Sequence, residues 1–142
     1  MNEEVREHVL AVADAIELEP LLYDQRSYSV ISKCNTPGCV AGWSGLLQDD
    51  PYPPGVGDSY DGDACDAWID RRRTALGLSG EALFGSTWPS EWLDRPPENI
   101  ESSYHRQMFL PTAQEAVFVL RRYAAGDIDP SSLYKPPAPV TY

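Results

Sequence analysis

The apolar residues of this chain recur at helical spacing in two segments, one near each end. In the first segment they are Val5, Val9, Val12 and Ile16. Asn2 precedes this segment as a residue that can cap a helix, and Pro20 follows it as a residue that cannot continue one. Acidic residues occupy the other faces. The pattern therefore predicts a surface helix that turns one apolar stripe towards a core.

The second segment has the strongest helix-start signal in the chain. Thr112 and Glu115 stand at capping-box spacing, directly after Pro111. The apolar residues that follow at core spacing are Ala113, Val117, Leu120 and Ala124. Gly126 is placed to stop the helix in a left-handed conformation. We therefore expect a second amphipathic helix that ends at Gly126.

Two further helices are expected between these segments. One begins within a run that contains two cysteines, with Thr36 as the N-cap and Pro37 at the first helical position, so that Cys39 is the third helical residue. The other runs from about Asp63 to Leu76. Its inward residues would be Ala64, Cys65, Trp68, Ile69, Ala75 and Leu76.

Shorter elements complete the expected fold. Gly77 fits a left-handed helix stop, Ser79 can cap a short turn through Phe84, and another turn can start at Pro89. Residues 27–31 alternate serine with apolar side chains, which is a weak strand pattern. The sequence thus predicts an all-α, compact single-domain helical bundle with short connecting turns, and allows a minor β element near residues 27–31.

All the predicted helices lie within residues 1–129, which we interpret as one domain because no linker or internal repeat divides them. Within this domain, residues 49–63 are rich in aspartate, proline and glycine and are expected to form an acidic loop. Residues 130–142 are proline-rich and are expected to form an extended C-terminal tail. Pro136 to Pro139 matches a minimal PxxP spacing, from which we assign no partner.

The net charge of the chain indicates which classes of partner it can bind. The chain of 142 residues has 22 acidic and 11 basic side chains, and its formal net charge is −11 at pH 7. Such a charge repels polyphosphates and attracts basic partners, which argues against direct nucleic-acid binding. No stretch approaches the roughly 18 to 20 apolar residues of a membrane span, and no signal peptide is recognisable. We therefore expect a cytoplasmic protein without a membrane segment.

Reduced thiols are the default for the three cysteines, although the spacing allows a Cys34–Cys39 disulfide, and three interpretations of their role stay open. A structural metal site would use Cys34, Cys39 and Cys65, completed by His8 or His105, although the spacing lacks a second Cys or His pair. A thiol-redox site would use Cys39 as a thiolate stabilised by a helix start, with Cys34 as its resolving thiol. The third interpretation is packing, since buried cysteine behaves as a small apolar residue.

Packing is the interpretation that the surrounding residues favour. Small residues at positions 38, 41, 42 and 45 would let neighbouring helices approach closely, while larger apolar residues fill the core. The residues of this structural motif are Cys34, Thr36, Cys39, Gly42 and Trp43. On this basis we expect no metal and no cofactor.

Candidate contact residues lie outside the motif. The acidic ones are Asp49, Asp50, Asp58, Asp61, Asp63 and Asp66. They fail the calcium-binding EF-hand register, because counting from Asp61 places Asp66 where glycine is needed and Arg72 where glutamate is needed. Trp88 and Trp92, four residues apart, would serve either as core residues or as exposed interface anchors.

Several short motifs occur together in the order of a known family. They are Cys34-x-Thr36-x-x-Cys39-x-Ala41-Gly42-Trp43, Ala75-Leu76-Gly77-Leu78, Ala82-Leu83-Phe84, Trp88-Pro89 and the helix before Gly126. The chain resembles a family of small bacterial and phage proteins of unknown function with a Cys-Gly-Thr-x-x-Cys-x-x-Gly-type motif. The resemblance spans roughly residues 27–129 and implies an all-α domain without established enzyme chemistry. Asn35 stands where this family usually has glycine.

These observations favour an acidic, non-enzymatic accessory factor that binds another protein and is related to phage proteins. A sharper version is an inhibitor that imitates nucleic acid towards a basic host protein, using the acidic loop and the first helix. The alternative from a different class is a thiol-redox or structural-metal protein using Cys34, Cys39 and Cys65. The sequence indicates no oligomeric state.

Overall fold

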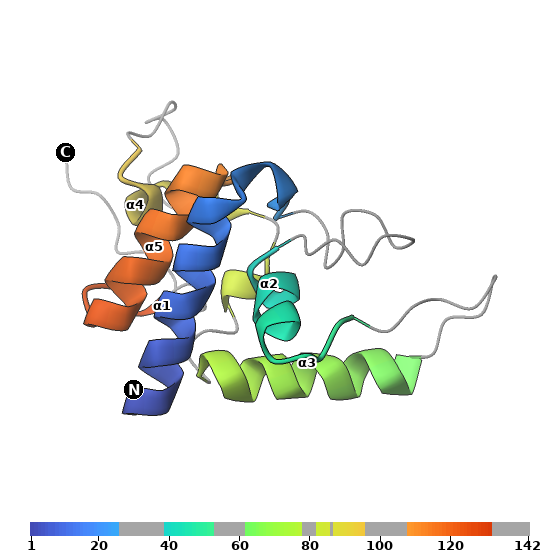
Figure 1. Ribbon diagram of the computed structural model, residues 1–142. Coiled ribbons are helices and arrows are strands. Elements are labelled where there is room, and N and C mark those ends of the chain that lie inside the picture. The colour runs from blue at the N-terminus through green and yellow to red at the C-terminus, as the bar shows by residue number, and fades with distance from the viewer. Residues whose placement is uncertain (26–38, 53–61, 78–81, 86, 96–107, 132–142) are drawn as a thin grey trace.

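The computed structural model describes residues 1–25, 39–52, 62–77, 82–85, 87–95 and 108–131. Its helices are α1 (Glu3–Leu18), the 3-10 helix η1 (Pro20–Leu22), α2 (Val40–Leu47), α3 (Gly62–Leu76), α4 (Ser90–Leu93) and α5 (Ala113–Ala125). Two strands, β1 (Trp88–Pro89) and β2 (Met108–Phe109), form a two-stranded antiparallel sheet. The expected all-α fold class is thus confirmed, with a small sheet added (Figure 1).

Helices α1 and α5 lie antiparallel and side by side, and together they form the main layer of the bundle (Figure 1). Both are defined by local caps. Asn2 Oδ1 accepts the Val5 N–H at 2.8 Å. Thr112 and Glu115 form the expected capping box, and Gly126 ends α5 at a φ of 82°. The sequence predictions for these two helices are confirmed because each rests on contacts within one helical turn.

Helices α2 and α3 pack beside this pair, and α3 runs crosswise to α1 beneath α2 (Figure 1). Helix α3 extends from Gly62 to Leu76, close to its expected bounds. Gly77 follows it with a φ of 86°, as the left-handed stop predicts. The inward side of α3 differs from the prediction, because Arg72 is buried along with Cys65, Trp68 and Leu76.

The predicted start of α2 is wrong. Cys39 is the N-cap of this helix, with φ −80° and ψ −179°, and Val40 is the first helical residue. Cys39 is therefore not the third residue of a helix, and Thr36 is not the N-cap. The helix begins at Val40 because a distant residue supplies the capping acceptor: the Val40 N–H donates to Gln25 Oε1 at 3.2 Å. Thr36 and Pro37 themselves lie outside the described residues.

The core lies where α1, α2 and α5 meet the short elements around α4. Its largest cluster includes Val9, Val12, Ile16, Val40, Trp43, Leu76, Leu83, Trp88, Trp92, Val117, Leu120 and Tyr123. A second, smaller cluster joins Cys39, Ala41 and Trp68 between α2 and α3. Burying apolar side chains on all the principal helices explains how so many short elements hold together.

Other predictions lie outside the described part of the chain. These concern the strand near residues 27–31, most of the acidic loop between residues 53 and 61, the cap at Ser79, and the tail from residue 132 onward. The sheet that the structure does show pairs Trp88 with Phe109 and Pro89 with Met108. Among the described helices, none combines the length and the apolar character needed to cross a membrane.

Candidate functional site

Cys39 and Cys65 are buried free thiols. The side chain of Cys39 is 1% exposed, and burial raises its pKa to about 11, although backbone amides of Gly42 and Ala41 act in the opposite direction. A thiol with such a pKa remains protonated near neutral pH, which argues against the thiol-redox alternative at Cys39 and agrees with the packing interpretation. Cys34 lies outside the described residues. Within the described ranges, no group of three or more His, Cys, Asp or Glu side chains could hold a metal ion.

The small residues of the cysteine motif have a packing role at Gly45. A Cβ at this position would collide with the carbonyl oxygen of Asp50 and would stand 3.2 Å from the ring of Trp68. The chain uses this space to close a turn, because Asp50 N–H donates to the Gly45 carbonyl at 2.7 Å and Trp68 Nε1–H donates to the Asp50 carbonyl at 2.6 Å. The end of α2 therefore packs directly on α3.

Asp50, a predicted contact residue for a partner protein, instead forms ion pairs with two arginines of its own chain. Its carboxylate receives Arg71 Nε–H at 2.8 Å and Arg72 Nη2–H at 2.9 Å. The hydrogen bond from Arg71, joined by the charges of both arginines, lowers the pKa of Asp50 against the opposing effect of burial. Arg72 is only 2% exposed. This carboxylate therefore neutralises a buried cation, which removes Asp50 from the set of available surface charges.

Among the other expected acidic contacts, Asp49, Asp63 and Asp66 are exposed. Asp58 and Asp61 lie outside the described residues. Asp49 has a φ of 53°, in the left-handed region that aspartate tolerates better than most residues. The described residues thus leave part of the predicted acidic surface open to solvent.

A second polar contact joins three helices. His8 on α1 lies with Nε2 2.7 Å from the Ser44 hydroxyl on α2, and Arg72 on α3 donates to the same hydroxyl at 2.9 Å. Burial, and then the charge of Arg72, lowers the pKa of His8. Ser44 is completely buried, so it is not placed as a nucleophile for a substrate in solution. This group has the geometry of a structural junction.

Trp88 and Trp92 are both buried and their ring centroids lie 6.2 Å apart. Their positions correct the interpretation of these residues as exposed interface anchors. Trp88 belongs to β1 and Trp92 to α4, and both contribute to the main core cluster. The physical reason is their large apolar area, which the short elements between α3 and α5 use to attach to the bundle.

One apolar feature of the described surface is a groove on α5 and the C-terminal end of α1, which we call the α1–α5 groove. Its volume is about 710 Å³. Its lining residues are Ile16, Glu17, Pro20, Ala113, Gln114, Val117, Phe118, Arg121, Arg122 and Asp127. Ile16 and Val117 are buried, whereas Phe118 is 40% exposed. The groove therefore offers apolar surface to a ligand from solvent.

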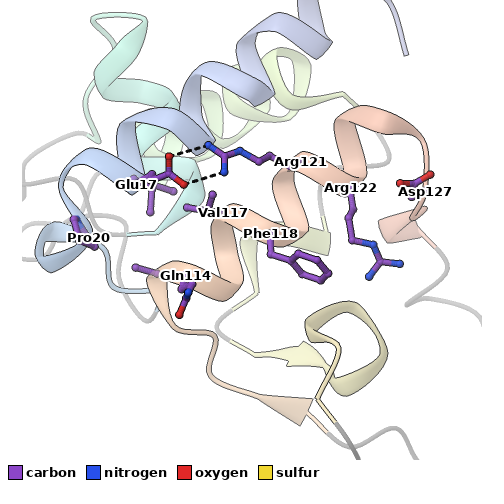
Figure 2. A pocket seen from close by; sticks show the side chains of 10 residues that line it. Glu17, Pro20, Gln114, Val117, Phe118, Arg121, Arg122 and Asp127 are labelled. Atoms are coloured by element: carbon purple, nitrogen blue, oxygen red, sulfur yellow. Dashed lines mark hydrogen bonds and ion pairs between the residues drawn. The ribbon is translucent and has the colours of Figure 1, made fainter.

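Charged side chains form ion pairs and a cation–ring contact along the groove. Arg121 donates to Glu17 Oε2 at 2.9 Å and to Asp14 Oδ1 at 3.1 Å, and its hydrogen bond lowers the pKa of Glu17. The Arg122 guanidinium lies over the Phe118 ring, 5.2 Å from its centroid. Figure 2 shows Glu17 and Arg121 facing each other between the two helices, with Phe118 and Arg122 on the other flank of α5.

Further apolar side chains are exposed beside the Pro20 end of the groove. They are Leu18, Leu21 and Leu22. The groove was not predicted from the sequence, because helical spacing indicates only the inward stripe of each helix. A usable signal was present at Phe118, a large apolar residue that falls outside the core spacing of Val117, Leu120 and Ala124.

The described residues define a small helical bundle with a buried polar junction and an apolar surface groove. Comparisons of the chain with protein-family models, with curated proteins and with solved structures find no match in any of the three. The resemblance to proteins with the Cys-Gly-Thr-x-x-Cys-x-x-Gly-type motif therefore stays a prediction. A function has to be inferred from the geometry of this chain alone.

Proposed function

We propose that this protein is a non-enzymatic binding protein whose α1–α5 groove receives an apolar segment carrying basic residues from a partner protein. The observation that carries the proposal is the groove itself, where Pro20 and Phe118 expose apolar surface and, with the buried Ile16 and Val117 beneath them, form an apolar floor. Partner helices commonly dock apolar side chains into grooves of this kind.

The net charge of the whole chain favours a basic partner, whereas the groove lining itself balances Arg121 and Arg122 against Glu17 and Asp127. Helix α1, which forms one wall, carries five carboxylates and one arginine. Arg121 occupies two of these carboxylates, at Asp14 and Glu17, while the whole chain has a net charge of −11. Long-range attraction would therefore increase the rate at which a basic segment meets the groove, and contact with the apolar floor would retain it.

A narrower form of this proposal is a phage-related inhibitor that imitates nucleic acid towards a basic host protein. Exposed Asp49, Asp63 and Asp66 add negative charge beyond the groove. If the partner's nucleic-acid-binding surface makes the contact, affinity should fall steeply as salt concentration rises. A contact confined to the apolar groove would instead show a shallow salt dependence.

The test uses two matched serine substitutions. Phe118 in the groove is 40% exposed, and Leu46 on α2 is 44% exposed, so Leu46→Ser is a control for removing an exposed apolar side chain. The first probe is a synthetic amphipathic helix of leucine and lysine, compared by fluorescence anisotropy with a version in which glutamate replaces lysine. We expect Phe118→Ser to weaken binding of the lysine peptide by about 10-fold, in keeping with a central apolar contact, and Leu46→Ser to leave it unchanged.

The second probe is the proteome of a bacterial host. A protein captured by the wild type and by Leu46→Ser, lost with Phe118→Ser, and cross-linked at the groove would support the proposal. Equal effects of the two serine substitutions, or equal binding of the lysine and glutamate peptides, would overturn it.

A further inference from the structure

We propose that residues 132–142 of this same chain occupy the α1–α5 groove as an internal ligand that a partner must displace. This inference rests on the proposed function, because it assigns a regulator to the same groove. Three features of the chain support it: the position at which the described residues end, the length of the segment beyond them, and the contrast in composition between this segment and the rest of the protein.

The described chain ends beside the groove. Asp127, one residue after the C-cap of α5, lines the groove. Pro130 is buried, and Asp129 Oδ1 accepts the Ser131 N–H at 3.0 Å and the Ser131 hydroxyl at 2.6 Å. The burial of Pro130 holds the chain against the bundle just before residue 132, and the two hydrogen bonds fix the local turn. The segment beyond therefore starts at the Asp127 end of the groove.

The segment is long enough to follow the groove. Residues 132–142 number eleven, and an extended proline-rich chain advances about 3.1 Å per residue, which gives a reach of roughly 34 Å. Helix α5 has 13 residues and is therefore about 20 Å long. A chain that turns back at Ser131 can pass Arg122 and Phe118 and arrive at Gln114 with residues to spare.

The composition of the segment matches the groove and differs from the rest of the chain. All the acidic residues of the protein precede residue 130, and Lys135 is the only charged side chain after it. The large apolar residues of the segment are Leu133, Tyr134, Val140 and Tyr142. Prolines at 136, 137 and 139 limit the conformations that are lost on binding, and grooves with exposed aromatic rings recognise such segments.

The charges fit a segment that enters the groove from its Asp127 end. Lys135 is four residues beyond Ser131, so it would lie near the Asp127 end, where a carboxylate lines the groove. The segment would bring no carboxylate side chain towards Glu17 or Asp14. Covalent attachment gives a short linked segment an effective concentration in the millimolar range, which makes even a weak contact well occupied.

The test keeps the full chain and its length. A photoreactive p-benzoylphenylalanine is placed at position 118 in one protein and at position 46 in a control, and cross-linked peptides are identified by mass spectrometry. We expect an intramolecular cross-link from position 118 to residues 132–142 and none from position 46. Cross-links from position 118 that reach a second copy, or that never reach residues 132–142, would overturn the inference.

A tail variant separates this inference from the proposed function. It combines Leu133→Ser, Tyr134→Ser, Val140→Ser and Tyr142→Ser in the full chain. If the wild-type tail fills about nine tenths of the grooves, this variant should bind the leucine–lysine peptide about 10-fold more tightly. Equal affinities, with Phe118-dependent binding in both proteins, would overturn only the internal ligand. A tail cross-link in a protein that binds no peptide with either tail would instead overturn the proposed function.

Discussion

The side-chain oxygen of Gln25 accepts the backbone N–H of Val40 at 3.2 Å and thereby caps helix α2 from fifteen residues earlier in the chain. The same oxygen accepts the Tyr23 hydroxyl at 2.9 Å. The amide nitrogen of Gln25 donates to the carbonyl oxygens of Leu83 at 2.6 Å and Gly85 at 2.8 Å. One buried amide thus joins three separate segments of the bundle.

Replacing Gln25 by alanine should lower the free energy of unfolding by about 2–4 kcal/mol, because it leaves several buried polar groups without partners. Urea denaturation monitored by circular dichroism would measure the loss. Gln114→Ala on the exposed side of α5 is the control and should change stability by less than about 0.5 kcal/mol. Equal losses for the two variants would show that the junction at Gln25 is not a main source of stability.

Arg71 and Arg72 are neighbours that pair with the same carboxylate but differ in burial. Arg72→Met should lower the free energy of unfolding by about 2–3 kcal/mol, because it removes buried hydrogen bonds to both Ser44 and Asp50. Arg71→Met removes an exposed pair and should leave the denaturation midpoint nearly unchanged. A larger loss for Arg71→Met than for Arg72→Met would contradict this assignment.

The junction at His8 predicts a pH dependence of stability. Because the pKa of His8 is lowered in the folded protein, the unfolded chain binds more protons as pH falls through the ordinary value of about 6.5. The free energy of unfolding should therefore decrease as pH falls below that value. Denaturation midpoints between about pH 5 and pH 8 would test this, and His8→Gln should flatten the dependence. The same slope in both proteins would exclude His8 as its source.

Gly77 and Gly126 both have a positive φ, but an added Cβ would collide with a neighbouring side chain only at Gly77. At Gly126 an added Cβ would have no neighbour within 4 Å, so Gly126→Ala should cost only the left-handed conformation, about 1 kcal/mol. At Gly77 the Cβ would lie 2.7 Å from the Tyr123 hydroxyl oxygen, which donates to the Leu76 carbonyl at 2.7 Å. Gly77→Ala should therefore cost about 1–2 kcal/mol more. Thermal unfolding would rank the two, and the reverse order would refute the collision.

Burial and the raised pKa of Cys39 predict an unreactive thiol. In the folded protein at mildly alkaline pH, iodoacetamide should label Cys39 far more slowly than in urea, because little thiolate is present and the sulfur is not accessible. Mass spectrometry of digested samples would follow this residue separately from the other two cysteines. Labelling of native Cys39 at the rate seen in urea would revive the thiol-redox alternative.

Local sequence patterns correctly predicted the caps and helix stops that depend on neighbours within one helical turn. Asn2, Thr112 with Glu115, and the stops at Gly77 and Gly126 all occur as the sequence predicts. Each is a cap or a turn whose donor, acceptor or dihedral angle is set a few residues away. The apolar stripes of α1 and α5 were recognisable for the same reason, since helical spacing alone places them on one face.

Features that join distant segments were decided only by the tertiary structure. Sequence spacing put the first residue of α2 at Pro37, whereas in the structure it is Val40, whose N–H donates to the buried side chain of Gln25. It also left Arg72 out of the inward face of α3, although Ser44, 28 residues away, accepts a hydrogen bond from the buried Arg72 guanidinium.

The α1–α5 groove belongs to the same category, because Arg121 meets Glu17 across a separation of 104 residues. By itself the sequence determined the principal helical segments, the inward faces of α1 and α5, and that the protein is strongly acidic. Tertiary packing decided which charges are neutralised and which apolar side chains remain outside. These outcomes depend on which helices come to lie side by side, and no local pattern of residues contains that information.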